Sequence, residues 1–151
     1  MNFKDMINEQ GICILEESDK KQALLKLIEC AVNQGAVHQE KTRELTERIF
    51  HREGLMSTGI GIGIAIPHVR YEGVKKPLIV MGIQPRGVPG YAAIDDQPVQ
   101  LVVMIIMGKN QHREYIDLLS HVVRFLKSDE IKSKLLQAKN AKDAYNLIKG
   151  A

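Results

Sequence analysis

The chain has no tryptophan and only two cysteines, and aromatic residues make up 5% of its 151 positions. The apolar segments 78–83 and 101–107 fall far short of the roughly 20 residues that a membrane-spanning helix needs. Cys13 and Cys30 have neither metal-ligand nor redox-motif spacing and stand among apolar neighbours, so we expect buried free thiols. The first residues lack the apolar core of a signal peptide. We therefore expect a soluble protein of the cytoplasm.

Charge of one sign is not concentrated anywhere along the chain. The 21 lysine and arginine residues only slightly outnumber the 18 aspartate and glutamate residues, which gives a net charge of +3. A nucleic-acid surface needs a strong and clustered positive charge, so we expect no nucleic-acid partner. The hydrophobic content of 44% is enough for one core, and we expect a single domain over residues 1–151.

Local patterns predict helices and strands in alternation. Ser18 and Asp19 are typical of a helix N-cap ahead of apolar residues at helical spacing, and Gly35 would end that helix. The further predicted elements are a helix over 39–52, strands over 60–66, 76–84 and 98–107, a helix from Asn110 to about 127, and two helices starting at Ser128 and Asn140. This order predicts a single α/β domain, with a mixed β-sheet flanked by helices on both faces.

The most informative segment is 58–68, with the sequence Thr-Gly-Ile-Gly-Ile-Gly-Ile-Ala-Ile-Pro-His. Its period of two predicts a strand, and glycine at every second position lets a ligand or another backbone approach one face. Pro67 stiffens the exit of that strand, so His68 is expected at a fixed place on the rim of the sheet. A histidine held there suits proton or phosphoryl chemistry, although it could also merely hydrogen-bond a neighbouring carbonyl.

Nucleotide and metal sites are not indicated. Gly59, Gly61 and Gly63 do not have the spacing of the dinucleotide fingerprint, and no Gly-Lys-Ser/Thr sequence follows them. The five histidines show neither an H-x-x-H nor an H-E-x-x-H spacing. We therefore expect no metal and no cofactor.

Residues elsewhere could complete a site around His68. Arg52 ends an apolar helical stripe, where it could supply a cation to a developing negative charge or simply complement the helix dipole. Ser57 and Thr58 could donate hydroxyl hydrogen bonds or be ordinary turn residues. His112 lies in the first turn of a predicted helix, where free backbone N–H groups attract anions.

The segment 58–68, preceded by Arg52 and Glu53, resembles the fructose/mannitol-type enzyme IIA domain of the bacterial phosphotransferase system, a group that includes the nitrogen-regulatory enzyme IIA proteins. The resemblance covers nearly the whole chain, and its Gly-Ile-Ala-Ile-Pro-His core is the specific part. It implies that His68 is the phosphoacceptor, that Arg52 is the site arginine and that Glu72 is a nearby acid.

The sequence departs from the family pattern at two places. Tyr115 stands where the family commonly has a second histidine, and a tyrosine hydroxyl can hydrogen-bond but cannot take the charge of an imidazolium. His112, one turn earlier on the same stripe, is the alternative to it. Arg70, close behind His68, is either an additional phosphate contact or a charged loop residue.

The resemblance implies two functions. In the first, His68 accepts phosphate from the phosphocarrier protein and passes it to a sugar-specific IIB domain. Docking these partners requires exposed apolar surface near Ile60, Ile62 and Ile64, and contact with the membrane is expected only through the permease. In the second, the domain is regulatory, and its phosphorylation state controls binding to a kinase, transporter or transcription factor. A degenerate domain that takes no phosphate is a third, weaker possibility.

Overall fold

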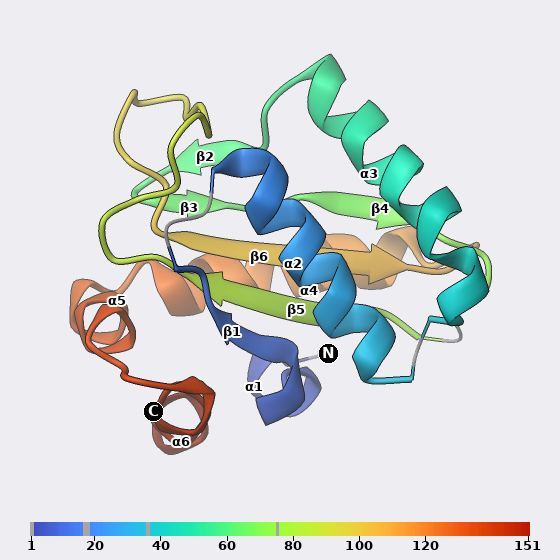
Figure 1. Ribbon diagram of the computed structural model, residues 1–151. Coiled ribbons are helices and arrows are strands. Elements are labelled where there is room, and N and C mark those ends of the chain that lie inside the picture. Colours follow the sequence, from blue (N-terminus) through green and yellow to red (C-terminus); the bar gives the residue numbers. More distant parts are fainter. Residues whose placement is uncertain (1, 17–18, 36, 75) are drawn as a thin grey trace.

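The computed structural model describes residues 2–16, 19–35, 37–74 and 76–151. Figure 1 shows a single sheet with helices in front of it and behind it. In chain order the elements are α1 (Phe3–Met6), η1 (Glu9–Gly11), β1 (Ile12–Ile14), α2 (Lys20–Asn33), η2 (Gln39–Lys41), α3 (Thr42–Leu55), β2 (Gly59–Gly61), β3 (Ile64–Ala65), β4 (His68–Arg70), β5 (Leu78–Ile83), β6 (Leu101–Met107), α4 (His112–Leu126), α5 (Asp129–Leu136) and α6 (Ala141–Gly150).

The sheet is mixed and is built around the pair β5–β6. These two strands are antiparallel, β1 lies parallel to β5 at one edge, and β3 lies parallel to β6. β4 also runs parallel to β6, further along the same side, and β2 is antiparallel to β3. The predicted α/β class, with a mixed sheet and helices on both faces, is confirmed.

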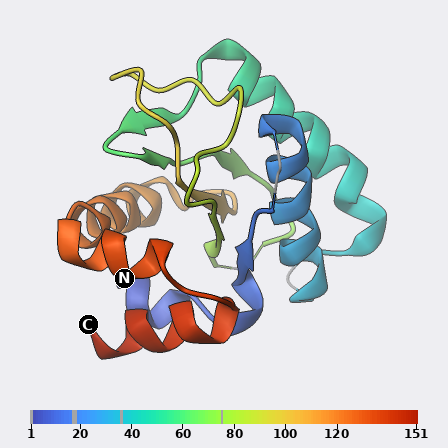
Figure 2. The ribbon, with the colours of Figure 1, turned by 60° about the vertical axis from the view of Figure 1, so that its left-hand side comes forward.

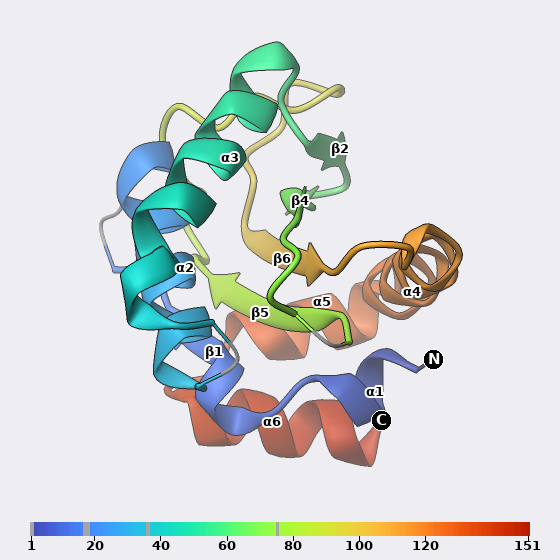
Figure 3. The ribbon, with the colours of Figure 1, turned by 90° about the vertical axis from the view of Figure 1, so that its right-hand side faces the viewer.

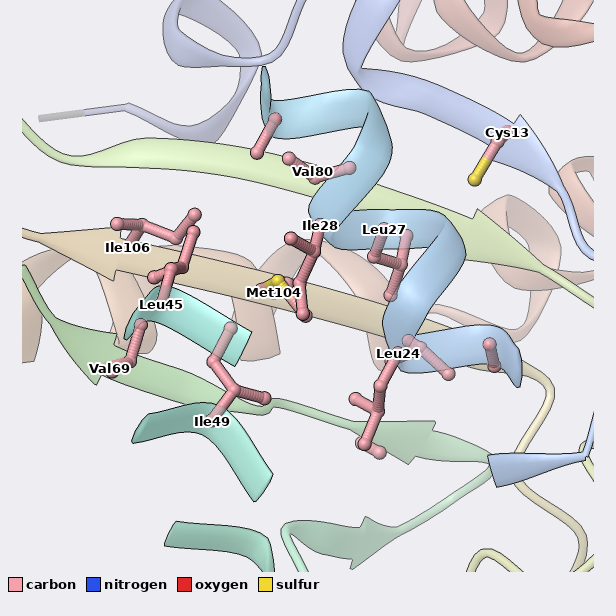
Figure 4. Close-up of a cluster of buried hydrophobic side chains, with 14 of the residues drawn as sticks. Cys13, Leu24, Leu27, Ile28, Leu45, Ile49, Val69, Val80, Met104 and Ile106 are labelled. Carbon is pink, nitrogen blue, oxygen red and sulfur yellow. The ribbon is translucent and has the colours of Figure 1, made fainter. Parts of the chain in front are cut away.

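The sheet lies between two hydrophobic clusters, one on each of its faces. β5 and β6 are buried over almost their whole length, and their side chains alternate between the two clusters, as expected for strands covered on both sides. On one face, α2 and α3 supply Leu24, Leu27, Ile28, Leu45 and Ile49 (Figure 4). On the other face, α4 supplies Tyr115, Leu118, Val122 and Leu126. Figure 3 shows the sheet between these two helical layers.

The first and last helices of the chain, α1 and α6, join α4 on the second face of the sheet. Phe3 of α1 is buried and its ring lies 5.4 Å from that of Phe125 in α4, and α6 packs its buried Ala144 and Ile148 into the same cluster. No periodic pattern predicts α1 or β1, because both are too short to show a period. None of the helices in the described segments has both the length and the apolar character that crossing a lipid bilayer requires.

Most helix boundaries lie within three residues of the prediction (α3 covers Thr42–Leu55, not 39–52), and the predicted cap of α4 is wrong. Asp19 caps α2 in a capping box with Gln22, whereas Ser18 lies outside the described residues. Ser128 and Asn140 cap α5 and α6 as predicted. Asn110 is not the cap of α4: it has a positive φ of 63°, and Gln111 is the N-cap. The side chain of Gln111 accepts a hydrogen bond from Gly108 N.

The predicted strand over 60–66 is wrong, because the chain folds there into the hairpin β2–β3. Gly61, Ile62 and Gly63 have φ angles of 93°, 53° and 80°, values that turn the backbone instead of extending it. Asp95 holds the turn by accepting from Ile62 N at 2.9 Å, and Lys132 Nζ donates to Ile62 O at 2.8 Å. Figure 2 shows the connection from β5 to β6 beside this hairpin. Ala93 of that connection bridges Gly59 of β2.

Candidate functional site

The backbone on either side of Pro67 fixes the position of His68. Ile66 N donates to Thr58 O at 3.0 Å, and Pro67 O accepts from Ile105 N at 2.9 Å. β4 then begins at His68, which pairs with Ile105 of β6. Since β3 and β4 both pair with β6, Pro67 lies in the short break between two strands that are hydrogen-bonded to the same neighbour. His68 is therefore held at the edge of the sheet, as the sequence predicts.

One nitrogen of the His68 ring is already committed. Its Nδ1 lies 3.0 Å from the carbonyl oxygen of Ile66. A carbonyl oxygen only accepts, so Nδ1 carries the proton in the neutral ring and the lone pair is on Nε2. The ring is half-buried, and this burial lowers the pKa of His68 below 6.5, with the charge of Arg52 acting in the same direction. The structure thus presents a neutral imidazole whose Nε2 can act as a nucleophile.

Tyr115 packs directly against His68. The two ring centroids are 5.0 Å apart and tilted by 32°, and Tyr115 is 7% exposed. The ring centroid of His112 lies 6.4 Å from that of Tyr115, and His112 is exposed. Burial raises the pKa of the Tyr115 hydroxyl. Of the two candidates on α4, it is therefore Tyr115 that lies on the His68 ring.

Arg52 lies in the last turn of α3 and faces the same space. Its Nη1 donates to Met56 O at 2.9 Å, so it satisfies a carbonyl just beyond the helix end. It also lines the two cavities that His68 and Tyr115 border. Arg52 therefore bonds a carbonyl beyond the helix end and also lies beside His68.

The two cavities differ in character. One, of about 520 Å³, is mainly apolar and is bordered by Met56, Ile60 and Ile94 besides His68. The other, of about 300 Å³, collects Arg52, Arg70 and His112 around His68 and Tyr115. The smaller cavity thus gathers three cationic or hydrogen-bonding side chains beside His68, whereas the larger one, which Arg52 also lines, is bordered mainly by apolar side chains.

The apolar side of the site is exposed at its rim. Met56, Ile60 and Ile94 have exposed fractions of 73%, 41% and 84%, whereas Ile64, in β3, is fully buried. Since isolated exposed apolar residues are common but clusters of them mark interaction surfaces, this rim is suited to docking another protein.

Thr58 belongs to a buried polar network behind the site. Its hydroxyl donates a short hydrogen bond to Oε2 of Glu53, and the hydroxyl of Tyr91 lies 2.8 Å from the Thr58 oxygen. Lys20 pairs with Oε1 of Glu53 at 3.1 Å and lies 4.6 Å from the Tyr91 ring centroid. Burial, and then the charge of Glu53, raise the pKa of Tyr91. The single Thr58 proton is committed to Glu53, so the hydroxyl helps to fix the start of β2.

Ser57 and Glu72, the remaining predicted residues, lie in different places. Ser57 borders the larger cavity, and its hydroxyl donates to Ala92 O at 2.6 Å. Glu72 is exposed in the turn after β4 and borders neither cavity. Within the described residues, His, Cys, Asp and Glu side chains form no group of three that could hold a metal.

Sequence reasoning did not find Lys20 and Tyr91, and it gave Glu53 no role. Lys20 and Tyr91 come from distant parts of the chain, and only the fold brings them to Glu53. The one local signal at Glu53 is its place next to Arg52, and only the structure shows that it lies in the last turn of α3 and is 6% exposed. A charged residue so deeply buried needs a partner, which Lys20 and Thr58 provide.

The family model described as "Phosphoenolpyruvate-dependent sugar phosphotransferase system, EIIA 2" matches residues 5–151. The chain belongs to this family. It is 29% identical to a fructose-specific EIIA component of Haloferax volcanii, with 89% of this chain and 86% of that protein covered. It is 31% identical to a fructose-specific EIIABC component of Bacillus subtilis, with 98% of this chain but 23% of that longer protein covered.

Among solved structures, the nitrogen regulatory protein IIA-Ntr of Neisseria meningitidis has the same fold, with a TM-score of 0.80 and 25% identity. The match covers 96% of this chain and 97% of that one. The family assignment agrees with the resemblance carried by the segment 58–68. Sugar-transport and nitrogen-regulatory proteins both stand among the relatives.

Proposed function

We propose that this enzyme IIA protein is a phosphohistidine carrier that accepts a phosphoryl group on His68 from a phosphocarrier protein and passes it to a IIB domain. The observation that carries the proposal is the His68 ring itself, whose Nδ1 is bonded to Ile66 O, leaving Nε2 as the free nitrogen, beside a cavity that Arg52 also lines. Family membership supports the same chemistry.

The proposed step exchanges one phosphorus–nitrogen bond for another. The lone pair on Nε2 of His68 attacks phosphorus, while the P–N bond of the donor phosphohistidine breaks and its nitrogen keeps the electron pair. The donor is already activated, so the step needs neither a metal nor a nucleotide. The lowered pKa of His68 keeps the attacking ring neutral near pH 7.

Arg52 is the group best placed to stabilise the phosphoryl oxygens. It is the cation that acts on His68, and a guanidinium donates several hydrogen bonds to phosphate in a fixed geometry. Arg70, His112 and Tyr115 line the same small cavity and would contact the remaining oxygens. Thr58, through Glu53, would hold the backbone around them, and Ser57 would hold the loop at Ala92. Glu72 has no role in this scheme because it lies outside both cavities.

The test is phosphoryl uptake from a phosphate-charged phosphocarrier protein, followed by intact-mass spectrometry. We expect one added phosphoryl group on the native chain and none on His68→Ala. His121→Ala is the matched control, because His121 lies on α4 away from both cavities and should leave uptake unchanged. Arg52→Gln should slow uptake by about 10- to 100-fold without abolishing it. Uptake by His68→Ala would reject the proposal.

The regulatory function is favoured by one specific observation, namely Tyr115 against the His68 ring. A tyrosine there cannot share positive charge in the way that a second histidine can, and this would slow the onward transfer. The experiment that separates the two functions measures transfer from the phosphorylated chain to a IIB domain. Transfer within seconds supports the carrier, whereas stable phosphorylation that changes binding to a target protein supports the regulator.

A further inference from the structure

A continuous path of hydrogen bonds leads from the buried carboxylate of Glu53 to the ring of His68. The Thr58 hydroxyl donates to Oε2 of Glu53, and the Thr58 carbonyl accepts from Ile66 N at 3.0 Å. The carbonyl of Ile66 in turn accepts from Nδ1 of His68 at 3.0 Å. Thr58 thus binds the carboxylate with its side chain, and with its main chain it binds the residue that holds the imidazole.

The inner end of this path is fixed by groups from α2 and from the 85–97 connection. Glu53 and Thr58 are only 6% and 5% exposed. Lys20 Nζ lies 3.1 Å from Oε1 of Glu53, and the Lys20 main chain donates to Pro89 O at 3.0 Å. The Tyr91 hydroxyl lies 2.8 Å from the Thr58 oxygen, and it is the donor because the single Thr58 proton goes to Glu53. The buried Thr58 hydroxyl therefore has both a fixed acceptor and a fixed donor.

The outer end of the path lies in the break between two strands. β3 ends at Ala65 and β4 begins at His68, so Ile66 and Pro67 lie between them. Pro67 O ties this break to β6, and Ile66 N ties it to Thr58. A shift of Thr58 would therefore move Ile66, and with it the carbonyl oxygen that accepts from Nδ1.

We propose that Glu53 and Thr58 are positioning residues that select the reactive tautomer of His68. Both act through the main chain of Ile66, whose carbonyl oxygen keeps the proton on Nδ1 and leaves the lone pair on Nε2. Without that acceptor, the proton can reside on Nε2, and this nitrogen then lacks the lone pair that attacks phosphorus. The inference rests on the proposed function, because it concerns the choice of the attacking nitrogen.

The test measures the tautomer of His68 in the full chain, without any phosphate donor. Heteronuclear NMR spectra of the ring nitrogens at about pH 8, where the ring is neutral, distinguish a protonated nitrogen from an unprotonated one. We expect the Nδ1–H form to predominate in the native chain. Thr58→Val keeps the shape of the side chain but lacks the hydroxyl, and its Nδ1–H fraction should fall to about half. Thr58→Ser keeps the hydroxyl and should stay close to the native fraction.

Two further variants separate positioning from a loss of stability. Ile148→Val removes part of a buried side chain on the other face of the sheet, so it should destabilise the fold without changing the tautomer. Glu53→Gln weakens the acceptor of Thr58, and it should shift the tautomer in the same direction as Thr58→Val. It carries the test if Thr58→Val does not fold. A native tautomer in Thr58→Val and Glu53→Gln, or an equal shift in Ile148→Val, would overturn the proposal.

Phosphoryl uptake then tests the consequence for the reaction. In Thr58→Val fewer rings carry the lone pair on Nε2 and those rings are less well oriented, so the maximal rate should fall by about 2- to 10-fold. The KM for the phosphocarrier protein should stay within about 2-fold, because the path does not bind the partner. A native chain that takes up no phosphate would reject the proposed function, whereas a native rate in a variant with a shifted tautomer would overturn this inference alone.

Discussion

The carboxylate of Glu53 accepts two hydrogen bonds from Thr58, one from its backbone N–H at 3.3 Å and one from its hydroxyl. This ties the last turn of α3, which carries Arg52, to the first residues of the hairpin β2–β3. Lys20 balances the buried charge from α2. The consecutive elements α3 and β2–β3 and the more distant helix α2 are thus connected at one side chain behind the His68 site.

The substitution Glu53→Gln should therefore weaken both the fold and the site. A neutral amide of the same shape offers only one acceptor oxygen and leaves Lys20 without its partner, so we expect the free energy of unfolding to fall by about 1–3 kcal/mol. Phosphoryl uptake should slow as well, because Arg52 and the hairpin lose their connection. Urea unfolding and the uptake assay measure the two effects.

Glu47→Gln is the matched control for this change. Glu47 lies on the same helix, and its pair with Arg43 is largely exposed, so its loss should change the free energy of unfolding by less than about 0.5 kcal/mol. If Glu53→Gln were equally harmless, the network would not be what holds the hairpin in place.

The lowered pKa of His68 sets the direction of a pH dependence. The buried neutral ring contributes stability that is complete above the unfolded value of about 6.5 and is lost as the pH falls through the lower folded value. The rate of phosphoryl uptake should likewise stay constant from pH 8 down to about 6.5 and decrease only in more acidic solution. NMR titration of the His68 ring protons and the pH–rate profile measure this.

His68→Ala provides the comparison for the stability part of that prediction. This variant should lack the component of the pH dependence that comes from the buried imidazole. A native His68 that titrates above 6.5 would contradict the role assigned to burial.

The packing of Tyr115 on His68 predicts different results for two substitutions. Tyr115→Phe keeps the ring in contact with His68 and should cost less than about 1.5 kcal/mol. Tyr115→Ala removes a ring that is 7% exposed and should lower the free energy of unfolding by about 3–5 kcal/mol. It should also merge the two cavities around His68. Thermal unfolding measures the two changes in stability. A changed chemical shift of the His68 ring in Tyr115→Ala, but not in Tyr115→Phe, detects the merging of the cavities.

The sequence was a good guide where a local rule decides the structure. Caps such as Asp19, Ser128 and Asn140 depend on neighbours only a few residues away, and the apolar strand β6 has no alternative to a buried position. The place of His68 at the sheet edge followed from Pro67, although the strand predicted before it is the hairpin β2–β3. For these features the tertiary structure agrees with the local preference.

The sequence failed where distant segments meet or where the backbone reverses. Alternating glycine and isoleucine has the period of a strand, and this pattern cannot show that Ile62 takes a positive φ held by Asp95 and Lys132. Spacing likewise could not show that Lys20 reaches Glu53. These relationships depend on how α2 and the 85–97 connection pack, which no short window of sequence contains.

The contact between Gly59 and the 85–97 connection gives the last prediction. A Cβ atom at position 59 would lie 2.1 Å from Ala92 O and 2.8 Å from Ala93 Cα, so Gly59→Ala forces two backbone segments apart. Ile94 and Ile60 on the rim of the larger cavity would separate with them, and docking of a partner protein should weaken by more than 10-fold in a binding titration. Gly54→Ala is the matched control, since its Cβ meets nothing within 4 Å and alanine favours the helix by up to about 1 kcal/mol. If both variants bound the partner equally well, the rim formed by Ile60 and Ile94 would not be the docking surface.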